Sequence, residues 1–459
     1  MLTQSDRLTT TAGGSLLIDG VAASDLIAEY GSPLYVLAED TLRDNYRRIT
    51  RAFARAWPGP VDVRYAIKAN NSLAVRAILS DEGAGGECFG EAELNASLLA
   101  RVDPSRLVLN GSNKSDQELR AAAQIGATVN IDAVDEVQRL ARQAENAGRR
   151  CRTNVRLKVA PTAFDELSSD YFRLPAGELR QYIADEKWGF SETAAAGVVD
   201  EILMNPHLRF CGYSVHLSRA SSSESFFRSG IREFAAAVAR LAERTATIPT
   251  VLDIGGGWPR GREPEVGSLE DLSGLTVEQC AQLVTAELSS IPREGAGHPA
   301  LWLEPGRYIV GNAVVLLTTV GSIKRDLGRV WINVDASTNN LMRIDTNGSY
   351  YRILPASRMH DTYEEQCIVV GPTCVASVLG TGRRLPKLER GDLLVILDAG
   401  MYAETTSTQF NGVPRPPTVL VWNGEAEVIR RRETVNDVFA THRVPERLLC
   451  GGPDHRSAQ

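Results

Sequence analysis

Lys68 is the residue of this 459-residue chain whose surroundings most directly suggest chemistry. It follows the stretch 61–67, in which every second residue is apolar, within the motif Tyr-Ala-Ile-Lys-Ala-Asn. Burial of an ammonium group lowers its pKa and makes the amine a better nucleophile for a carbonyl carbon. The pattern therefore predicts a Schiff-base lysine, with an ordinary surface lysine at a strand end as the alternative.

Three more groups of residues follow strand-like runs in the same way. The glycines Gly255–Gly257 would let backbone N–H groups approach an anion closely, and Arg307 would add a fork of donors. His216 would supply an aromatic ring and Glu304 a carboxylate. Taken singly, these residues could be a flexible turn, a structural ion pair and a buried histidine. Together with Lys68, they describe a site for pyridoxal 5'-phosphate (PLP).

Eight short β-rich runs alternate with helical stretches and would position these residues. Such alternation is typical of parallel βαβ units, and eight units in about 250 residues fit a (β/α)8 barrel, with a doubly wound open sheet as the alternative. In a barrel the residues just past the strands meet at one mouth, where barrel enzymes have their active sites. The expected strands are Asp62–Ile67, Gly86–Phe89, Arg106–Asn110, Thr128–Asp132, Cys151–Val159, Phe210–His216, Thr250–Ile254 and Ala300–Glu304.

The two ends of the chain have a different pattern. Apolar runs lie at Ser15–Ile18 and Pro33–Leu37, and β-like segments separated by Gly, Pro and Asn follow residue 313. This pattern predicts an all-β domain, a β-barrel or a sandwich, to which both ends contribute. We therefore expect an α/β barrel domain over residues 38–312 and a β domain over residues 1–37 and 313–459.

The composition excludes several classes of protein. A formal charge of -7 and a pI near 5.6 argue against a nucleic acid or an anionic membrane as partner. No signal peptide and no transmembrane segment is evident, and the seven cysteines are scattered singly, which favours reduced thiols and a cytoplasmic location. No metal site is expected.

Six motifs occur along the chain in an order that resembles a known family. They are similar to those of the PLP-dependent diaminopimelate/ornithine decarboxylases, fold type III enzymes with an alanine-racemase-like fold. The likeness extends from about residue 33 to Asp437 and includes Arg430–Thr434. It implies a PLP-dependent amino acid carboxy-lyase of biosynthesis, a divergent member of the family. The motifs are Tyr65–Asn70, His216, Asp253–Gly257, Glu304–Arg307, Gly371–Cys374 and Ala399–Tyr402.

The resemblance implies a role for each matched residue. Lys68 looks like the lysine that links to the cofactor, and His216 like the ring that stacks on its pyridine face. Glu304 would keep the pyridine nitrogen protonated, so that the ring accepts the electrons left after CO2 departs. Glu87 stands where relatives commonly have aspartate, and Glu93 matches another carboxylate near the cofactor. The phosphate would be held by Gly255, Gly256, Gly257, Arg307 and Tyr402.

Cys374 aligns with a cysteine that relatives contribute across a dimer interface. There the thiol helps to return a proton to Cα after decarboxylation, a task that suits a reference pKa near 8.5. Without the resemblance, a buried and inert cysteine would be the simpler interpretation. The resemblance implies a homodimer whose β domain contributes to the partner's active site, and Lys68, His216, Glu304 and Cys374 as the catalytic residues.

The positions expected to bind the substrate depart from the family pattern. Val375 replaces the acidic residue that meets the distal ammonium group of ornithine, lysine or diaminopimelate, and an ammonium unpaired against valine would cost roughly several kcal/mol. Arg219 stands where relatives have serine. Arg343 matches an arginine that binds a distal carboxylate, but Ile344 replaces the proline after it. With Tyr402, we expect Val375 and Arg343 to contact the substrate. Arg219 would face an anionic group of the substrate, with the phosphate or solvent as the alternatives.

Three functional hypotheses remain. The first is decarboxylation of a modified, conjugated or carrier-tethered amino acid in specialised biosynthesis, because Val375 argues against a free distal ammonium group. The second is diaminopimelate decarboxylase itself, with the ammonium group bound by another residue. The third is an inactive homologue that binds a protein partner, which the presence of Lys68, Glu304, Arg307, Cys374 and Tyr402 makes improbable.

Overall fold

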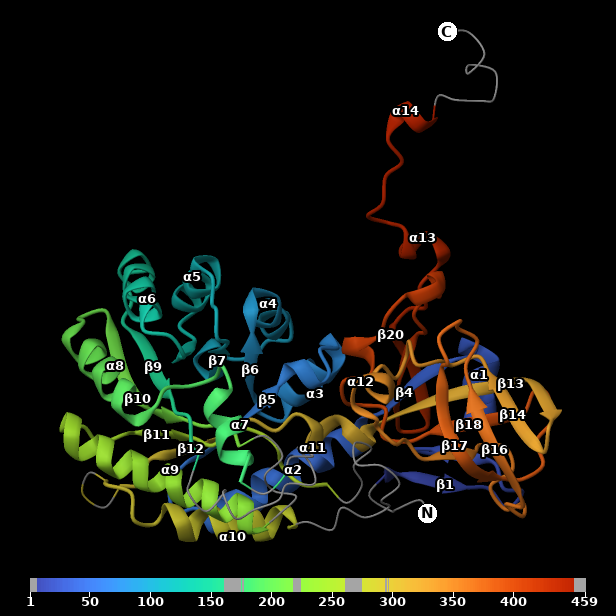
Figure 1. Ribbon diagram of the computed structural model, residues 1–459, viewed down its shortest axis with the longest axis horizontal. Coiled ribbons are helices and arrows are strands. Elements are labelled where there is room, and N and C mark those ends of the chain that lie inside the picture. The colour runs from blue at the N-terminus through green and yellow to red at the C-terminus, as the bar shows by residue number, and fades with distance from the viewer. Residues whose placement is uncertain are drawn as a thin grey trace.

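Eight parallel strands close into a barrel in this computed structural model, which describes residues 6–160, 175, 177–217, 224–260, 275–293, 295 and 297–449. The order around the barrel is β10-β11-β12-β5-β6-β7-β8-β9 (Figure 1). The fold class expected from the sequence is confirmed, with every barrel strand found within three residues of its expected ends. The strands are β5 (Val61–Ala66), β6 (Gly85–Phe89), β7 (Leu107–Asn110), β8 (Thr128–Ile131), β9 (Cys151–Arg156), β10 (Leu208–Ser214), β11 (Val251–Asp253) and β12 (Ala300–Leu303).

Helices surround the barrel and bury one apolar face each against it. In α2, for example, Leu42, Ile49 and Phe53 are buried while the opposite face carries arginines. Capping boxes begin two of these helices, at Ser115 and at Thr276. The helices are α2 (Glu39–Ala56), α3 (Leu73–Asp81), α4 (Gly90–Leu99), α5 (Asp116–Ile125), α6 (Asp135–Asn146), α7 (Leu179–Asp185), α8 (Glu192–Met204), α9 (Glu224–Thr245), α10 (Val277–Leu288) and α11 (Arg307–Val310).

A second sheet of nine strands lies beside the barrel (Figure 1). Its path is β17-β16-β14-β13-β4-β19-β20, and β15 and β18 pair beside β13. The N-terminal strand β4, which is buried throughout, lies between β13 and β19. The strands are β4 (Leu34–Ala38), β13 (Val314–Asp326), β14 (Arg329–Val334), β15 (Ile353–Pro355), β16 (Glu365–Val370), β17 (Val378–Leu385), β18 (Leu393–Ile396), β19 (Thr418–Trp422) and β20 (Glu425–Arg430).

The remaining elements lie at the two ends of the chain. Near the N-terminus, the small sheet β1 (Leu8–Thr10), β2 (Leu16–Ile18) and β3 (Val21–Ala22) precedes α1 (Ala23–Tyr30). Beyond β20, the short helices α13 (Val435–Val438) and α14 (Glu446–Leu449) project away from the body of the molecule (Figure 1). Among the helices described, none combines the length and the apolar character that a membrane crossing requires.

The inside of the barrel is unusually polar near its carboxyl-terminal mouth. Glu87, Asn154 and Asp253 are completely buried, and Asn130 and Glu304 are nearly so. Burying a polar group without a hydrogen-bond partner costs free energy, so a buried polar cluster of this kind indicates a functional site. This mouth of the barrel is therefore where we place the candidate active site.

Candidate active site

A cavity of about 440 Å³ lies at the carboxyl-terminal ends of the barrel strands. Four of the expected site residues line it together, namely Lys68, Glu87, His216 and Glu304. They come from four different strand ends, those of β5, β6, β10 and β12. The barrel thus brings together residues that are far apart in the sequence.

Lys68 lies in a single 3-10 turn, Ile67–Ala69, directly after β5. Its ammonium nitrogen donates a hydrogen bond of 2.5 Å to Oε2 of Glu87 and lies 4.6 Å from the ring centre of Phe89. Burial alone would lower the pKa of Lys68, but Glu87, Tyr402 and Glu304 together outweigh it, and the pKa is raised. The expected lowering of this pKa is therefore wrong for the protein without a bound cofactor.

Glu304 enters the cavity from the end of β12. Its backbone N–H donates to the carbonyl of Gly255, and its Oε1 accepts a hydrogen bond of 2.9 Å from the amide of Asn110. Burial and the neighbouring carboxylate of Asp253 raise its pKa well above the usual value, and burial raises the pKa of Asp253 as well. Both carboxyl groups are therefore easier to protonate than usual, and a cationic partner near Glu304 would lower its pKa again.

Three asparagines that the sequence analysis missed connect these groups. The amide nitrogen of Asn110 donates to both Glu87 and Glu304, each at 2.9 Å. The side-chain oxygen of Asn110 accepts a hydrogen bond of 2.8 Å from the amide of Asn130. The side-chain oxygen of Asn130 in turn accepts one of 2.9 Å from the amide of Asn154. The three residues stand on the successive strands β7, β8 and β9. The strand pairing in a barrel aligns them, a signal that was available once the eight strands had been placed.

His216 lies two residues beyond β10, and its ring is exposed to the cavity. Burial within the barrel, with the cations Lys68, Arg156 and Arg307 nearby, lowers the pKa of His216 to about 3. The imidazole is therefore neutral at physiological pH. A neutral ring with an open face can stack on another aromatic ring without charge repulsion.

The glycine turn after β11 has no room for side chains. Gly255 and Gly257 have positive φ angles, and a Cβ atom at Gly255 would lie 2.6 Å from the carbonyl oxygen of Val215. A Cβ atom at Gly256 would lie 2.6 Å from the carbonyl oxygen of Glu304. The backbone here packs closely against two cavity walls, as a turn that cradles an anion must.

Arg307 and Tyr402 lie next to the turn that carries Lys68. The backbone N–H of Tyr402 donates to the carbonyl of Ala69, and the guanidinium of Arg307 lies 5.8 Å from the ring centre of Tyr402. A reactive lysine, an aromatic face, a carboxyl group deep in the barrel and a glycine turn beside an arginine match the functional groups of PLP. The residues present therefore fit this cofactor.

The substrate-binding residues expected from the sequence are only partly brought together. The guanidinium of Arg343, at the start of α12 (Arg343–Asn347), lies 4.8 Å from the ring centre of Tyr402. Cys374 and Val375 lie in the turn after β16, where both are exposed, and neither lines the cavity of its own chain. Arg219 lies outside the described residues.

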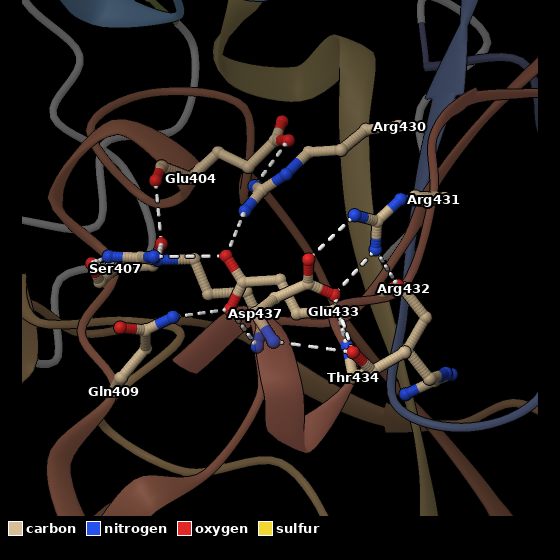
Figure 2. Close-up of polar contacts among 10 residues, drawn as sticks. Glu404, Ser407, Gln409, Arg430, Arg431, Arg432, Glu433, Thr434 and Asp437 are labelled. Atoms are coloured by element: carbon tan, nitrogen blue, oxygen red, sulfur yellow. Dashed lines mark hydrogen bonds and ion pairs between the residues drawn. The ribbon is translucent and has the colours of Figure 1, made fainter. Parts of the chain in front are cut away.

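The turn that carries Cys374 rests on a well-anchored loop. The backbone N–H of Cys374 donates to Oδ1 of Asn411 at 2.9 Å. On either side of Asn411, ion pairs tie the loop to the end of β20 and the segment after it: Glu404 with Arg430 at 2.9 Å, and Arg415 with Glu433 at 3.0 Å. Figure 2 shows this network, in which Gln409 also donates to Glu433. The stretch Arg430–Thr434 thus supports the loop rather than lining the cavity.

One wall of the cavity comes from the end of β9 and the segment that follows it. Arg156 and Trp188 line it, with the guanidinium 4.8 Å from the indole ring centre, and Tyr182, Ile183 and Glu186 of the α7 region complete it. Residues 161–174 and 176 lie outside the described residues.

The fold and the site define a PLP-binding barrel enzyme with an adjoining β domain. Residues 40–311 match the family model described as "Pyridoxal-dependent decarboxylase, pyridoxal binding domain". The chain is 35% identical to the diaminopimelate decarboxylase of Methanothermobacter thermautotrophicus, covering 95% of this chain and 97% of the relative. It is 30% identical to that of Archaeoglobus fulgidus, covering 96% and 100%.

Solved structures give the same result. The diaminopimelate decarboxylase of Methanocaldococcus jannaschii, known from a crystal structure, is 26% identical to this chain. The two structures superpose with a TM-score of 0.87, covering 97% of this chain and 99% of the other. The chain belongs to the diaminopimelate/ornithine decarboxylase family of pyridoxal-dependent decarboxylases. The resemblance seen in the motifs is confirmed, and with it the PLP cofactor and the carboxy-lyase class.

Proposed function

We propose that this enzyme decarboxylates diaminopimelate, removing one α-carboxylate and forming lysine. The observation that carries the proposal is the similarity to diaminopimelate decarboxylases along nearly the whole of both chains. The position of Arg343 beside Tyr402 supports it, because a guanidinium at this place would bind the carboxylate that the substrate keeps.

The comparisons favour this hypothesis over the one that stood first in the sequence analysis. That hypothesis, a modified, conjugated or carrier-tethered substrate, rested on Val375, and no relative reported above supports it. It remains the second candidate on one observation, the uncharged and 43% exposed side chain of Val375.

In the proposed mechanism, each cavity residue has a separate task. Bound PLP supplies an electron sink for the pair left when the Cα–CO2 bond breaks. Lys68 provides the amine that holds the cofactor, and Glu87 keeps that amine protonated until it reacts. The neutral ring of His216 would lie against the cofactor ring, and Glu304 would pair with its pyridine nitrogen. Gly255–Gly257, with Arg307 and Tyr402, would hold the phosphate.

We further propose that the enzyme is a homodimer in which Cys374 serves the site of the partner. The thiol is exposed on its own chain and does not line the cavity there, while the other cysteines described are buried. A thiol that donates a proton to Cα must reach the reacting carbon. A second copy of the chain would bring Cys374 to the mouth of the barrel.

The test of the substrate is direct. Purified enzyme with PLP is incubated with meso-diaminopimelate, ornithine, lysine and N-acylated diamino acids, and release of CO2 and formation of amine are measured. We expect meso-diaminopimelate to be turned over with the highest kcat/KM and to yield lysine, while Lys68→Ala is inactive. Preference for an acylated or carrier-bound amino acid would favour the second candidate instead.

A further inference from the structure

Diaminopimelate poses an electrostatic problem for this site. After one end of the molecule enters the reaction, the other end keeps an ammonium group and a carboxylate. The carboxylate has a candidate partner in Arg343, but Val375 offers nothing to the ammonium. An ammonium group that is desolvated without a partner costs several kcal/mol, so a family member acting on this substrate needs a carboxylate elsewhere.

Among the described residues, three carboxyl groups line the cavity, and two of them already form hydrogen bonds with other side chains. Glu87 binds Lys68 and Asn110, and Glu304 binds Asn110 and lies against Asp253. The third is Glu186. Among the described residues, no hydrogen bond or ion pair forms with its side-chain carboxylate, although its backbone carbonyl accepts from Lys158.

The backbone around Glu186 is fixed to the barrel. Phe190 N–H donates to the carbonyl of Arg156 at 2.8 Å, and Lys158 N–H donates back to Phe190 at 2.9 Å. Gly189, with a φ of 75°, packs so closely that a Cβ atom would lie 2.8 Å from the carbonyl carbon of Leu157. Glu186 thus stands at a defined place on the cavity wall.

The two positively charged side chains of the same wall, Lys158 and Arg156, contact groups other than the Glu186 carboxylate. The ammonium group of Lys158 caps the end of α7 by donating to the carbonyls of Ala184, at 2.7 Å, and of Glu186. The guanidinium of Arg156 stacks on Trp188. Neither neutralises the carboxylate of Glu186, which leaves its charge available to a cationic ligand inside the cavity.

We propose that Glu186 determines specificity by accepting the distal ammonium group of the substrate, in place of the acidic residue that Val375 has replaced. The inference rests on the proposed function, since it assigns the partner of one group of diaminopimelate. Apolar neighbours such as Ile183 and Trp188 strengthen the contact, because a charge-assisted hydrogen bond gains strength where water is excluded.

The test uses two ligands that differ in this group alone. L-Lysine and 6-aminohexanoate share the ω-amine and the carboxylate, but only lysine has the α-ammonium group. Their dissociation constants are measured by calorimetry on the PLP-loaded wild type, on Glu186→Gln and on Glu186→Asp. Glu178→Gln is the matched control, because Glu178 is exposed at the other end of α7 and does not line the cavity.

We expect the wild type and Glu178→Gln to bind lysine about tenfold or more tightly than 6-aminohexanoate, the value of one charge-assisted hydrogen bond. Glu186→Gln should reduce that preference to about twofold or less, and Glu186→Asp should restore part of it. For diaminopimelate turnover, Glu186→Gln should raise KM about tenfold and change kcat little. Misfolding would not produce this difference between the two constants.

Two negative results can be told apart. If the wild type turns over diaminopimelate and Glu186→Gln keeps the full preference for lysine, Glu186 is not the partner and the proposed function stands. If the wild type neither binds lysine nor turns over diaminopimelate, the proposed function falls, and the assignment of Glu186 falls with it.

Discussion

The amide of Asn110 joins the two carboxyl groups on which the proposed chemistry depends. It donates to Glu87, the partner of Lys68, and to Glu304, whose pKa is raised by burial and by the nearby Asp253. An amide is suited to this place because it offers two N–H donors and carries no charge. A carboxylate in place of Asn110 would add repulsion to a site that already has Glu87, Glu304 and Asp253.

The charge of Glu87 should control the reactivity of Lys68. Its carboxylate raises the pKa of Lys68, so the neutral variant Glu87→Gln should lower that pKa by about one unit or more. The measurement is the pH dependence of the rate at which the apoprotein captures PLP, followed by absorbance, and the midpoint should move to lower pH. An unchanged midpoint would show that burial or Glu304 governs the lysine instead.

Lys68, His216 and Glu304 could be predicted because each lies one or two residues past a strand that the sequence marks clearly. The hydrogen-bonded series Asn110, Asn130 and Asn154 could not be predicted. An asparagine inside a strand looks like any other polar interruption until the strand register shows which asparagines are neighbours. Glu186 was missed for a related reason. Its place in the cavity depends on the backbone pairing of Phe190 with β9, which is a tertiary contact.

At the scale of the element, Glu93 ties helix α4 to strand β6. Its Oε2 accepts a hydrogen bond of 2.6 Å from the N–H of Phe89, the residue that precedes the helix. Burial raises the pKa of Glu93 to about 7, an effect that the nearby Glu87 increases and the Phe89 N–H opposes. The start of α4 therefore contains a carboxyl group that is neutral at mildly acidic pH.

This pKa makes stability depend on pH in a defined direction. The unfolded chain ionises Glu93 near the usual pKa of 4.5 and the folded chain near 7, so the folded state loses stability as pH rises through this window. Glu93→Gln cannot ionise, so its free energy of unfolding relative to the wild type should rise by about 1–3 kcal/mol between pH 5 and pH 8.

Chemical denaturation of the apoproteins at the two pH values measures this difference. Glu364→Gln, which removes one exposed carboxylate, controls for the change in net charge. Equal differences at pH 5 and pH 8 would contradict the assignment.

The barrel elements were predictable because parallel strands buried on both faces produce apolar runs. Strands β15 and β17 in the second sheet were not predicted. Strand β15 spans only Ile353–Pro355, and β17 contains two glycines and two arginines that hide its alternation. Arg383 of β17 is nevertheless buried, with its guanidinium 3.7 Å from the ring centre of Tyr350, a contact that no local pattern could indicate.

For the whole molecule, the proposed dimer makes a quantitative prediction. Lys68→Ala and Cys374→Ala should each be nearly inactive, but a mixture of the two chains should recover activity. If Cys374 serves the partner, random exchange leaves one intact site in each hybrid dimer, or about a quarter of wild-type activity. Sedimentation tests whether the protein is a dimer, and a mixture that exchanges subunits without recovery would place Cys374 in the site of its own chain.

The place of β4 in the second sheet has a consequence for synthesis of the chain. This strand leaves the ribosome early, but its neighbours β13 and β19 begin only at Val314 and Thr418. Both edges of β4 must therefore wait unpaired while the barrel is translated, and unpaired apolar edges attract aggregation. We expect the barrel to form first on the nascent chain, with the second sheet closing last, so that shielding of β4 by a chaperone would govern the yield of active enzyme.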